Sequence, residues 1–296
     1  MSDSSFRAVT IAGATGTLGY HVADAFLNDG SYKFVSRKRR RNHYSQKDEL
    51  VKALKGTDVL ISAVRTQGNN DTFYDAQLPL LTSAKEAGVK RFIPSEFGSE
   101  FPDVSHPFSD DKSKFRAEVE KSGLEYTIIN NGVFSEYLDF IGFDVKNKKV
   151  TFMTDRDLKI SATSLHDVGK YTVESLKIPD ARNAYIRVAA DTLSFNELLK
   201  KFEEASGEYL TFHSKLLHLK TVVNDDSLYE GSKWEVVEDR EIRKRFLEKI
   251  DPVPSPLEEL QAFICENTRF AKTDNDKFSF TPISIDDVIK ALVKGS

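Results

Sequence analysis

Three glycines near the N-terminus constrain the fold of this chain more than any other feature. Gly13, Gly16 and Gly19 have the spacing G-x-x-G-x-x-G, directly after a β-branched run at residues 9–11 and directly before a helix-compatible segment at residues 20–27. In such a unit the first glycine permits a tight turn, the second admits a pyrophosphate, and the third lets helix and strand pack closely. The motif therefore predicts the start of a dinucleotide-binding fold, although glycine turns also connect strands to helices in proteins that bind no nucleotide.

The rest of the first half alternates between strand-like and helix-like segments, which predicts an α/β fold with a doubly wound parallel sheet. Buried strands are expected at residues 57–64 and 89–93, with a helix at residues 73–87 between them. After about residue 150 the glycine turns stop and the pattern becomes that of a smaller α+β region. We therefore expect a cofactor-binding domain over residues 1–150 and a substrate-binding region over residues 151–296.

The second predicted strand, residues 32–36, ends at Arg37, and this position indicates which nucleotide is bound. Sites selective for NAD place an acidic side chain there, whereas an arginine suits the additional 2′-phosphate of NADP. Four more cations follow at residues 38–41, a run that also occurs in nucleic-acid patches and in solvated loops. Because the formal net charge of −4 argues against a generally basic surface, we expect NADP(H) rather than nucleic acid as the ligand.

The segment between Arg37 and Asp48 contains ten residues. That length is too short for the second helix and third strand of a usual dinucleotide fold. Either this edge of the sheet has been trimmed, or residues are missing from the sequence at this point. We favour the second explanation.

Composition narrows the remaining possibilities. No window of about eighteen apolar residues indicates a membrane span, and residues 1–7 lack the basic-then-apolar pattern of a secretory signal. The single cysteine, Cys265, has no second cysteine for a disulfide and no neighbouring ligand cluster for a metal. We therefore expect a cytoplasmic protein that binds neither membrane nor metal.

The helix that begins near Asp110 and Asp111 carries the candidate catalytic residue. At about 100° per residue, one narrow face contains two cations and two apolar side chains, Lys112, Phe115, Arg116 and Val119. Either both long side chains pass along the apolar stripe to water, or Lys112 enters the cofactor cleft as a proton donor or acceptor while Arg116 holds or orients a cofactor phosphate. The second interpretation requires that burial lower the pKa of Lys112, a shift that Asp110 and Asp111 would oppose if their carboxylates lay close.

Further cofactor contacts are expected at the carboxyl ends of the strands, where clefts form in parallel sheets. Ser95 follows the strand at residues 89–93 and either lines the cofactor or caps its own loop. Residues 131–134 follow the next strand and could flank the nicotinamide. The predicted cofactor-binding residues are Gly13, Thr15, Gly16, Thr17, Leu18, Gly19, Arg37, Ser95 and Arg116.

Four stretches make the chain resemble the NmrA-like family of atypical short-chain dehydrogenases, and within it the branch of isoflavone reductases and phenylcoumaran benzylic ether reductases. They read GATGTLG at residues 13–19, GVKRFIPSEFG at residues 88–98, KSKFR at residues 112–116 with Tyr126-Thr127 after it, and DTLSFNEL at residues 191–198. The resemblance implies that NADPH is the cofactor, that Lys112 and Arg116 are the family's helix-borne lysine and arginine, and that Arg37 binds the 2′-phosphate. The chain departs from the family in the shortened segment after Arg37 and in Ala117, where relatives often have a second arginine.

The leading hypothesis is an NADPH-dependent reductase of a small, aromatic or conjugated substrate, in which the nicotinamide supplies hydride and Lys112 handles a proton. The alternative, implied by the resemblance to NmrA-type regulators, is a non-catalytic sensor that reports the NADP state to a protein partner. Lys112 on the inward face favours the enzyme, because a sensor needs no acid–base group. A third possibility is a protein whose shortened edge prevents cofactor binding. The sequence specifies neither the substrate's identity nor the oligomeric state.

Overall fold

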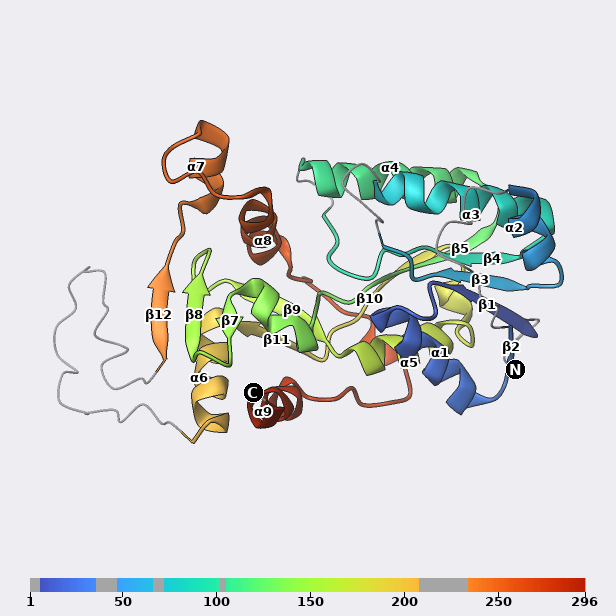
Figure 1. Cartoon of the computed structure of the whole chain (residues 1–296). Coiled ribbons are helices and arrows are strands. Elements are labelled where there is room, and N and C mark those ends of the chain that lie inside the picture. The colour runs from blue at the N-terminus through green and yellow to red at the C-terminus, as the bar shows by residue number, and fades with distance from the viewer. Residues whose placement is uncertain (1–5, 36–46, 66–71, 102–104, 208–233, 296) are drawn as a thin grey trace, which may run out of the picture. The chain divides into compact units, whose positions relative to one another are not determined.

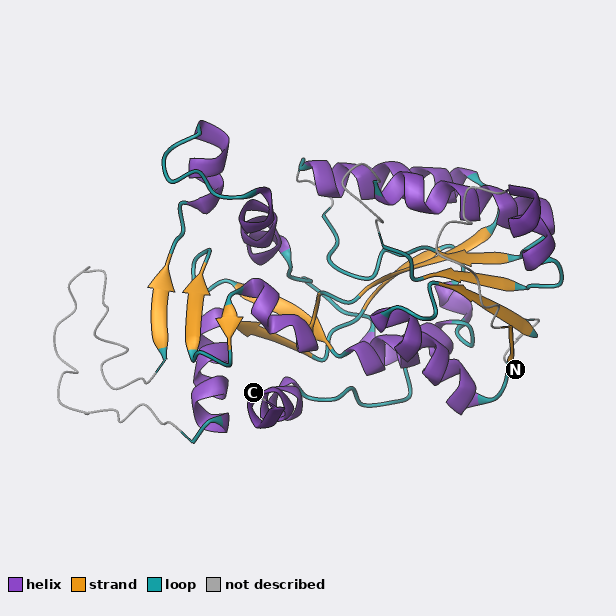
Figure 2. Ribbon diagram, viewed as in Figure 1, coloured by secondary structure: helices purple, strands orange, loops and turns teal. Residues whose placement is uncertain are grey.

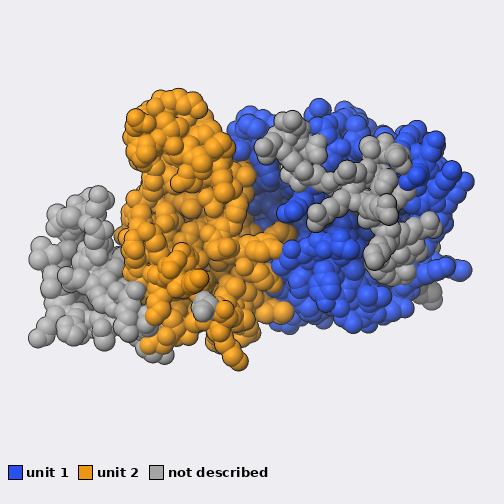
Figure 3. Space-filling model, viewed as in Figure 1, with its two compact units in different colours: residues 1–132, 163–189, 270–282 blue, residues 133–162, 190–269, 283–296 orange. Residues whose placement is uncertain are grey.

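The computed structural model describes residues 6–35, 47–65, 72–101, 105–207 and 234–295. The chain divides into two compact units, shown in blue and orange in Figure 3. Unit 1 contains residues 1–132, 163–189 and 270–282, and unit 2 contains residues 133–162, 190–269 and 283–296. This division differs from the single boundary that we expected at residue 150, because later parts of the chain return to unit 1.

A six-stranded parallel sheet forms the centre of unit 1, in the order β10-β5-β4-β3-β1-β2. Its strands are β1 (Ala8–Ala12), β2 (Lys33–Val35), β3 (Val59–Ser62), β4 (Arg91–Ile93), β5 (Glu125–Asn130) and β10 (Ala184–Arg187). The chain leaves β1 toward β2 on one side and then adds β3 on the other. Such a reversal leaves a crevice at the carboxyl end of β1, where open α/β sheets bind ligands. The predicted doubly wound α/β fold is confirmed.

Helices cover both faces of this sheet (Figures 1 and 2). One face carries α2 (Lys47–Leu54), α3 (Phe73–Ala87) and α4 (Pro107–Lys121), and the other carries α1 (Thr17–Asp29) and α5 (Leu165–Ser175). Two short 3-10 helices, η2 (Pro179–Ala181) and η4 (Asn275–Lys277), also belong to unit 1. Between the sheet and α3 and α4, the core contains the buried side chains Leu60, Leu80, Phe92, Phe115 and Val119.

Strand β10 lies at one edge of the sheet, although its residues come from the part of the chain that we expected to bind substrate. It pairs in parallel with β5 and places the buried Ile186 opposite Ile129. A parallel pair needs a crossover connection, and α5 lies in the connection that leads to β10. Helix α5 also packs closely on α1, and Gly169 permits this approach because it has no side chain. A Cβ at that position would lie 2.5 Å from the carbonyl oxygen of His21. These contacts are the reason that residues 163–189 belong to unit 1.

At the opposite edge of the sheet, β2 pairs with β1. Within the described part of the chain no strand lies beyond β2, and the next element, α2, leads directly to β3. Residues 36–46 between β2 and α2 lie outside the described residues. The predicted role of Arg37 and the question of the short segment between Arg37 and Asp48 therefore also lie outside them.

Two three-stranded sheets form unit 2, in the orders β11-β9-β6 and β12-β8-β7. Their strands are β6 (Val133–Phe134), β7 (Phe143–Asp144), β8 (Lys149–Phe152), β9 (Lys159–Thr163), β11 (Asp191–Ser194) and β12 (Glu235–Glu238). The helices are η1 (Ser135–Ile141), α6 (Phe195–Ala205), α7 (Ile242–Glu248), α8 (Pro256–Asn267) and α9 (Ile285–Gly295). Stacked rings of Phe143, Phe195 and Phe202, with the ring of Trp234, form the centre of the core. Short strands mixed with helices match the α+β pattern expected for the later part of the chain.

None of the described helices is both long enough and apolar enough to cross a membrane. Among the same residues, no group of three or more His, Cys, Asp or Glu side chains could hold a metal ion. Cys265 is a buried free thiol in unit 2. Its burial raises the pKa of the thiol above the ordinary range, so the group stays protonated at neutral pH.

Candidate active site

The glycine turn after β1 requires glycine at its first and third positions. Gly13 has a φ of +85°, and a Cβ there would lie 2.5 Å from the carbonyl oxygen of Ala63. A Cβ at Gly19 would lie 2.1 Å from the carbonyl oxygen of Gly13. These approaches bring the start of α1 against the turn and the turn against the chain after β3. No other residue type fits at either position, so the spacing has the packing role that the sequence predicted for it.

Helix α1 begins directly at this turn, and no side chain caps its N-terminus. Gly16 is the N-cap residue, and its carbonyl accepts from the N–H of Tyr20 at 2.8 Å. Thr15, Gly16 and Thr17 are exposed, and Leu18 is half-buried. The first N–H groups of a helix have no intrahelical partner and lie at the positive end of its dipole. The turn therefore fits a pyrophosphate, and the cofactor contacts assigned to residues 13–19 stay predictions.

Ser95 lies in the loop after β4 and is held by protein groups. Its N–H donates to Gln77 Oε1 at 2.7 Å, and its hydroxyl donates to the carbonyl of Val64 at 2.8 Å. Gln77 belongs to α3 and is completely buried. Ser95 thus ties the loop after β4 to the loop after β3 and to α3. These are the bonds expected of the loop-capping alternative, and the cofactor contact assigned to Ser95 stays a prediction.

Several buried polar atoms at the carboxyl ends of the strands have no hydrogen-bond partner among the described residues. They are Ser62 Oγ at the end of β3, Glu96 Oε1 after β4, and the Oδ1 atoms of Asn130 and Asn131 at and after the end of β5. Buried polar groups in native proteins are nearly always hydrogen-bonded. These atoms leave hydrogen-bonding capacity at this edge of the sheet that water, a ligand or residues outside the described ranges can use. It is the edge at which open α/β sheets bind ligands.

Lys112 is buried on the inward face of α4, with 3% of its surface exposed. Its Nζ donates to the backbone carbonyl of Glu96 at 2.9 Å. The same nitrogen lies 4.7 Å from the ring centre of Phe73 on α3 and 5.2 Å from that of Phe108 on α4. The side chain therefore does not pass to water. Because Glu96 follows β4, the amine lies at the carboxyl edge of the sheet.

The surroundings of Lys112 lower the pKa of its amine. Burial is the main cause, Glu96 and Asp111 oppose the shift with their negative charges, and the positive charge of Arg116 adds to it. Asp111 is itself engaged, because its carboxylate accepts from the N–H of Tyr74 at 3.1 Å. Asp110 accepts from the hydroxyl of Ser105. The neutral form of the amine is therefore populated at a lower pH than in an exposed lysine, as acid–base chemistry requires.

Arg116 forms an ion pair rather than extending freely into the cleft. Its Nη1 lies 2.9 Å from Oε2 of Glu96, and its Nη2 donates to Ser113 Oγ at 2.6 Å. The Arg116 side chain is 11% exposed, and that of Glu96 is completely buried. The predicted contact of Arg116 with a cofactor phosphate stays a prediction, whereas its contact with Glu96 is present.

Glu96 is the site residue to which the sequence assigned no role. Its position directly after a strand was visible, and so were the two cations on the inward face of one helix. Their juxtaposition was not, because a contact between residues 96 and 116 depends on how α4 crosses the sheet. Two cations on the inward face of one helix, which need a counter-ion there, are the signal that could have indicated it.

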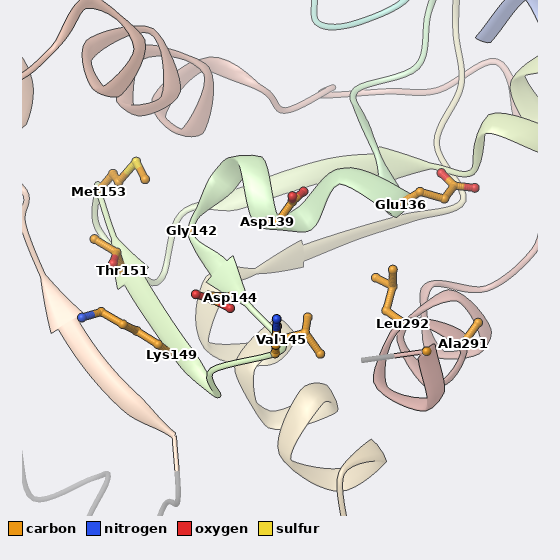
Figure 4. A pocket seen from close by; sticks show the side chains of 12 residues that line it. Glu136, Asp139, Gly142, Asp144, Val145, Lys149, Thr151, Met153, Ala291 and Leu292 are labelled. Atoms are coloured by element: carbon orange, nitrogen blue, oxygen red, sulfur yellow. The ribbon is translucent and has the colours of Figure 1, made fainter. Parts of the chain in front are cut away.

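Unit 2 contains a separate pocket of about 760 Å³ (Figure 4). It is lined by η1, β7, β8 and α9, through Glu136, Asp139, Gly142, Asp144, Val145, Lys146, Lys149, Thr151, Met153, Ala291, Leu292 and Gly295. Two of its charged side chains are already engaged, Asp144 with Asn147 and Lys149 with Glu235. The lining combines these charged side chains with apolar ones, among them Val145, Met153 and Leu292. The substrate-binding role expected for residues 151–296 stays a prediction.

Comparison with known proteins gives a consistent result. A model of the NmrA-like family matches residues 41–224. A phenylcoumaran benzylic ether reductase of Pinus taeda is 29% identical over 232 residues, which are 66% of this chain and 74% of that protein. An oxidoreductase of Aspergillus flavus is 31% identical over 225 residues, 67% and 74% of the two chains. A bifunctional pinoresinol-lariciresinol reductase of Thuja plicata is 30% identical over 241 residues, 68% and 76% of the two chains.

Solved structures show the same fold. An isoflavone reductase superposes with a TM-score of 0.74 at 20% identity, over 98% of this chain and 100% of that one. The binary complex of leucoanthocyanidin reductase with NADPH, from Vitis vinifera, gives 0.73 at 19% identity, over 97% and 99% of the two chains. At this level of identity the likeness is one of fold.

Proposed function

Because the chain belongs to the NmrA-like family, we propose that it is an NADPH-dependent reductase of a small aromatic or conjugated substrate. Its relatives include a phenylcoumaran benzylic ether reductase and a pinoresinol-lariciresinol reductase, and a structure of the same fold contains NADPH. The observation that carries the proposal is Lys112, a buried lysine with a lowered pKa at the ligand-binding edge of the sheet. A protein that only bound the nucleotide would need no such group.

The glycine turn and the N-terminus of α1 would hold the pyrophosphate of NADPH. Gly13 and Gly19 keep the turn close to the helix, and the N–H groups of the first turn of α1, beginning at the exposed Thr17, would donate hydrogen bonds to the pyrophosphate. Arg37, outside the described residues, would bind the 2′-phosphate. When bound, NADPH supplies the hydride. The residues of the chain bind the cofactor, orient the substrate and transfer the proton.

Lys112 would exchange the proton that accompanies hydride transfer. Burial favours the neutral amine, which accepts a proton from a phenolic hydroxyl; in its protonated form it donates one to a carbonyl oxygen. The hydrogen bond to the carbonyl of Glu96 fixes the direction of the amine. The rings of Phe73 and Phe108 beside it exclude water from that side.

Turnover and binding of Lys112→Ala, measured separately, test this proposal. NADPH oxidation would be followed with a panel of phenolic and conjugated carbonyl substrates, and NADPH affinity by calorimetry. We expect turnover to fall by about 100-fold or more with NADPH affinity retained, since acid–base catalysis contributes on that order. The matched control is Lys114→Ala, because Lys114 lies on the same helix but is exposed. Equal turnover in the wild type and Lys112→Ala would contradict the role of the lysine.

Calorimetry with NADPH, NADP⁺ and NADH distinguishes the alternative functions. A preference for NADPH over NADH, followed by turnover, supports the reductase. Binding of NADP⁺ in preference to NADPH, with no turnover of any substrate, would favour the non-catalytic sensor. Binding of none of the three would favour a protein whose trimmed edge prevents cofactor binding.

A further inference from the structure

Glu96 is a fully buried carboxylate at the candidate active site. It follows β4 by three residues, and none of its surface is exposed to solvent. Burying a carboxylate is unfavourable unless a cation or several donors compensate for the lost water. One of its oxygens, Oε1, has no partner among the described residues. A charged side chain kept in such a place indicates a role that an apolar residue could not fill.

Glu96 contacts both cations of the inward face of α4, and it does so through different groups. Its carboxylate Oε2 accepts from Arg116 Nη1 at 2.9 Å. Its backbone carbonyl accepts from Lys112 Nζ, also at 2.9 Å. Arg116 is fixed a second time by its bond to Ser113 Oγ. An ammonium and a guanidinium one helical turn apart are thus tied to a single residue of the loop after β4.

The charges around Lys112 act in opposite directions. Arg116 on α4 lowers the pKa of the amine, whereas Glu96 after β4 and Asp111 on α4 raise it. The side chains of α3 and of the first turn of α4 that lie over the amine, Phe73 and Phe108, are uncharged rings. The protonation of Lys112 therefore depends on burial together with the balance between Glu96 and Arg116.

We propose that Glu96 is a positioning residue for proton transfer by Lys112. Its backbone carbonyl orients the Lys112 amine through a hydrogen bond. Its carboxylate holds Arg116 near the amine in an ion pair. Arg116 then acts on the reaction through Glu96 rather than by binding a cofactor phosphate. The proposal rests on the proposed function, because it takes Lys112 as the group that exchanges a proton with substrate.

The proposal predicts effects of opposite sign from the two members of the ion pair. Glu96→Gln keeps the backbone carbonyl and nearly the same shape but removes the negative charge, so the pH at which Lys112 is half-protonated falls. Arg116→Gln removes the positive charge, so that pH rises. A pair with no electrostatic influence on the amine would give no such opposition, and the kinetic measurements below separate a role in turnover from a purely structural one.

An NMR titration of the protein without cofactor measures this pH directly. Lysine is labelled with ¹³C at Cε, and the Lys112 signal is identified by its loss in Lys112→Met. The matched control is Glu125→Gln. This substitution disrupts another ion pair of the same sheet, in which Glu125 lies 2.9 Å from Arg91 and the Arg91 side chain is 6% exposed. We expect the control to leave the Lys112 midpoint unchanged. If Glu96→Gln does not fold, the proposal is tested by Arg116→Gln alone, in which the pH midpoint of Lys112 should rise. Equal midpoints in the wild type and in the folded variants overturn the proposal.

Kinetics then connect positioning with turnover. We expect Glu96→Gln to lower kcat by about tenfold and to shift its pH profile in the same direction as the NMR midpoint. We expect NADPH affinity to change by less than about twofold. Arg116→Lys, which keeps the cation, should recover more kcat than Arg116→Gln. Weaker NADPH binding with unchanged kcat would assign the pair to the cofactor and overturn the proposal.

The titration needs no substrate, so failure of one proposal can be told from failure of the other. Opposite midpoint shifts in the two variants, together with a wild type that reduces no substrate, would reject the reductase and with it the proton transfer, and would leave only the electrostatic coupling of Glu96 and Arg116 to Lys112. Turnover that depends on Lys112, with no midpoint shift in either variant, would retain the reductase and reject the role of Glu96.

Discussion

Replacing Gly19 with alanine is expected to disrupt the glycine turn and to weaken cofactor binding together. The new Cβ would lie 2.1 Å from the carbonyl oxygen of Gly13, 2.7 Å from its carbonyl carbon and 2.9 Å from Cα of Ala14. Ordinary contact begins at 3.4 Å, and all three neighbours are backbone atoms that cannot turn aside. The N-terminus of α1 must therefore move away from the turn by roughly 1 Å, at a cost of about 1–3 kcal/mol.

Gly16→Ala is the matched control for this change. Gly16 has a φ of −79°, which alanine adopts readily, and its Cβ would lie 3.3 Å from the same carbonyl oxygen of Gly13. We expect a loss of stability below about 0.5 kcal/mol. Because residue 16 is an exposed part of the turn predicted to hold the pyrophosphate, Gly16→Ala should weaken NADPH binding with little effect on unfolding. Gly19→Ala should affect both.

Urea unfolding followed by circular dichroism gives the stabilities, and calorimetry with NADPH gives the affinities. The expected order of stability is wild type, then Gly16→Ala, then Gly19→Ala. If Gly19→Ala unfolds at the same urea concentration as Gly16→Ala, the close approach of α1 to the turn does not limit the choice of residue. The packing argument for the third glycine would then be refuted.

Three further predictions concern the amine, the core and the nucleotide. Lys112→Met removes an amine whose pKa is lowered by burial. Between that lowered pKa and the ordinary value of 10.5, the amine is protonated in the unfolded chain but neutral in the folded protein. The stability of the wild type relative to Lys112→Met therefore rises with pH over this range, by up to about 1.4 kcal/mol per pH unit. Urea unfolding from about pH 7 to 10, with Lys114→Met as control, measures this, and a difference independent of pH would contradict it. Phe115→Ala removes a fully buried ring that packs against Phe92 and should cost about 3–5 kcal/mol in thermal unfolding; a loss below about 1 kcal/mol would show that the site collapses around the smaller residue. Arg37→Glu should weaken binding of NADPH by about tenfold or more while leaving NADH unaffected or improved, and equal losses for both nucleotides in calorimetry would argue against a contact with the 2′-phosphate.

Local patterns in the sequence predicted those parts of the fold that depend on neighbouring residues. The predicted helix over residues 73–87 coincides with α3, because Thr72 caps its start and Gly88 adopts a positive φ at its end. The predicted face of α4 is also present, since Lys112, Phe115 and Val119 are all buried. Helical periodicity indicates which side chains point inward. It does not indicate what they contact.

Contacts between distant segments were the part that could not be predicted. Strand β10 has the short apolar pattern of many strands, and nothing within residues 184–187 indicates that it pairs with β5 rather than with a strand of unit 2. Glu96 likewise has a recognisable position but no local sign of its ion pair with Arg116, twenty residues later. Register and pairing of this kind depend on the whole sheet.

The interleaving of the two units has a consequence for how this protein can be divided or recombined. The chain passes between the units five times, at residues 132, 162, 189, 269 and 282. A fragment ending at residue 150 would lack β10 and leave the edge of β5 unpaired, which is a template for aggregation. It would also lack α5, the helix against which α1 packs. A chimaera that exchanges unit 2 with that of a relative must therefore join the chains at all five of these positions, since a fusion at a single junction would transplant part of the six-stranded sheet of unit 1 with it.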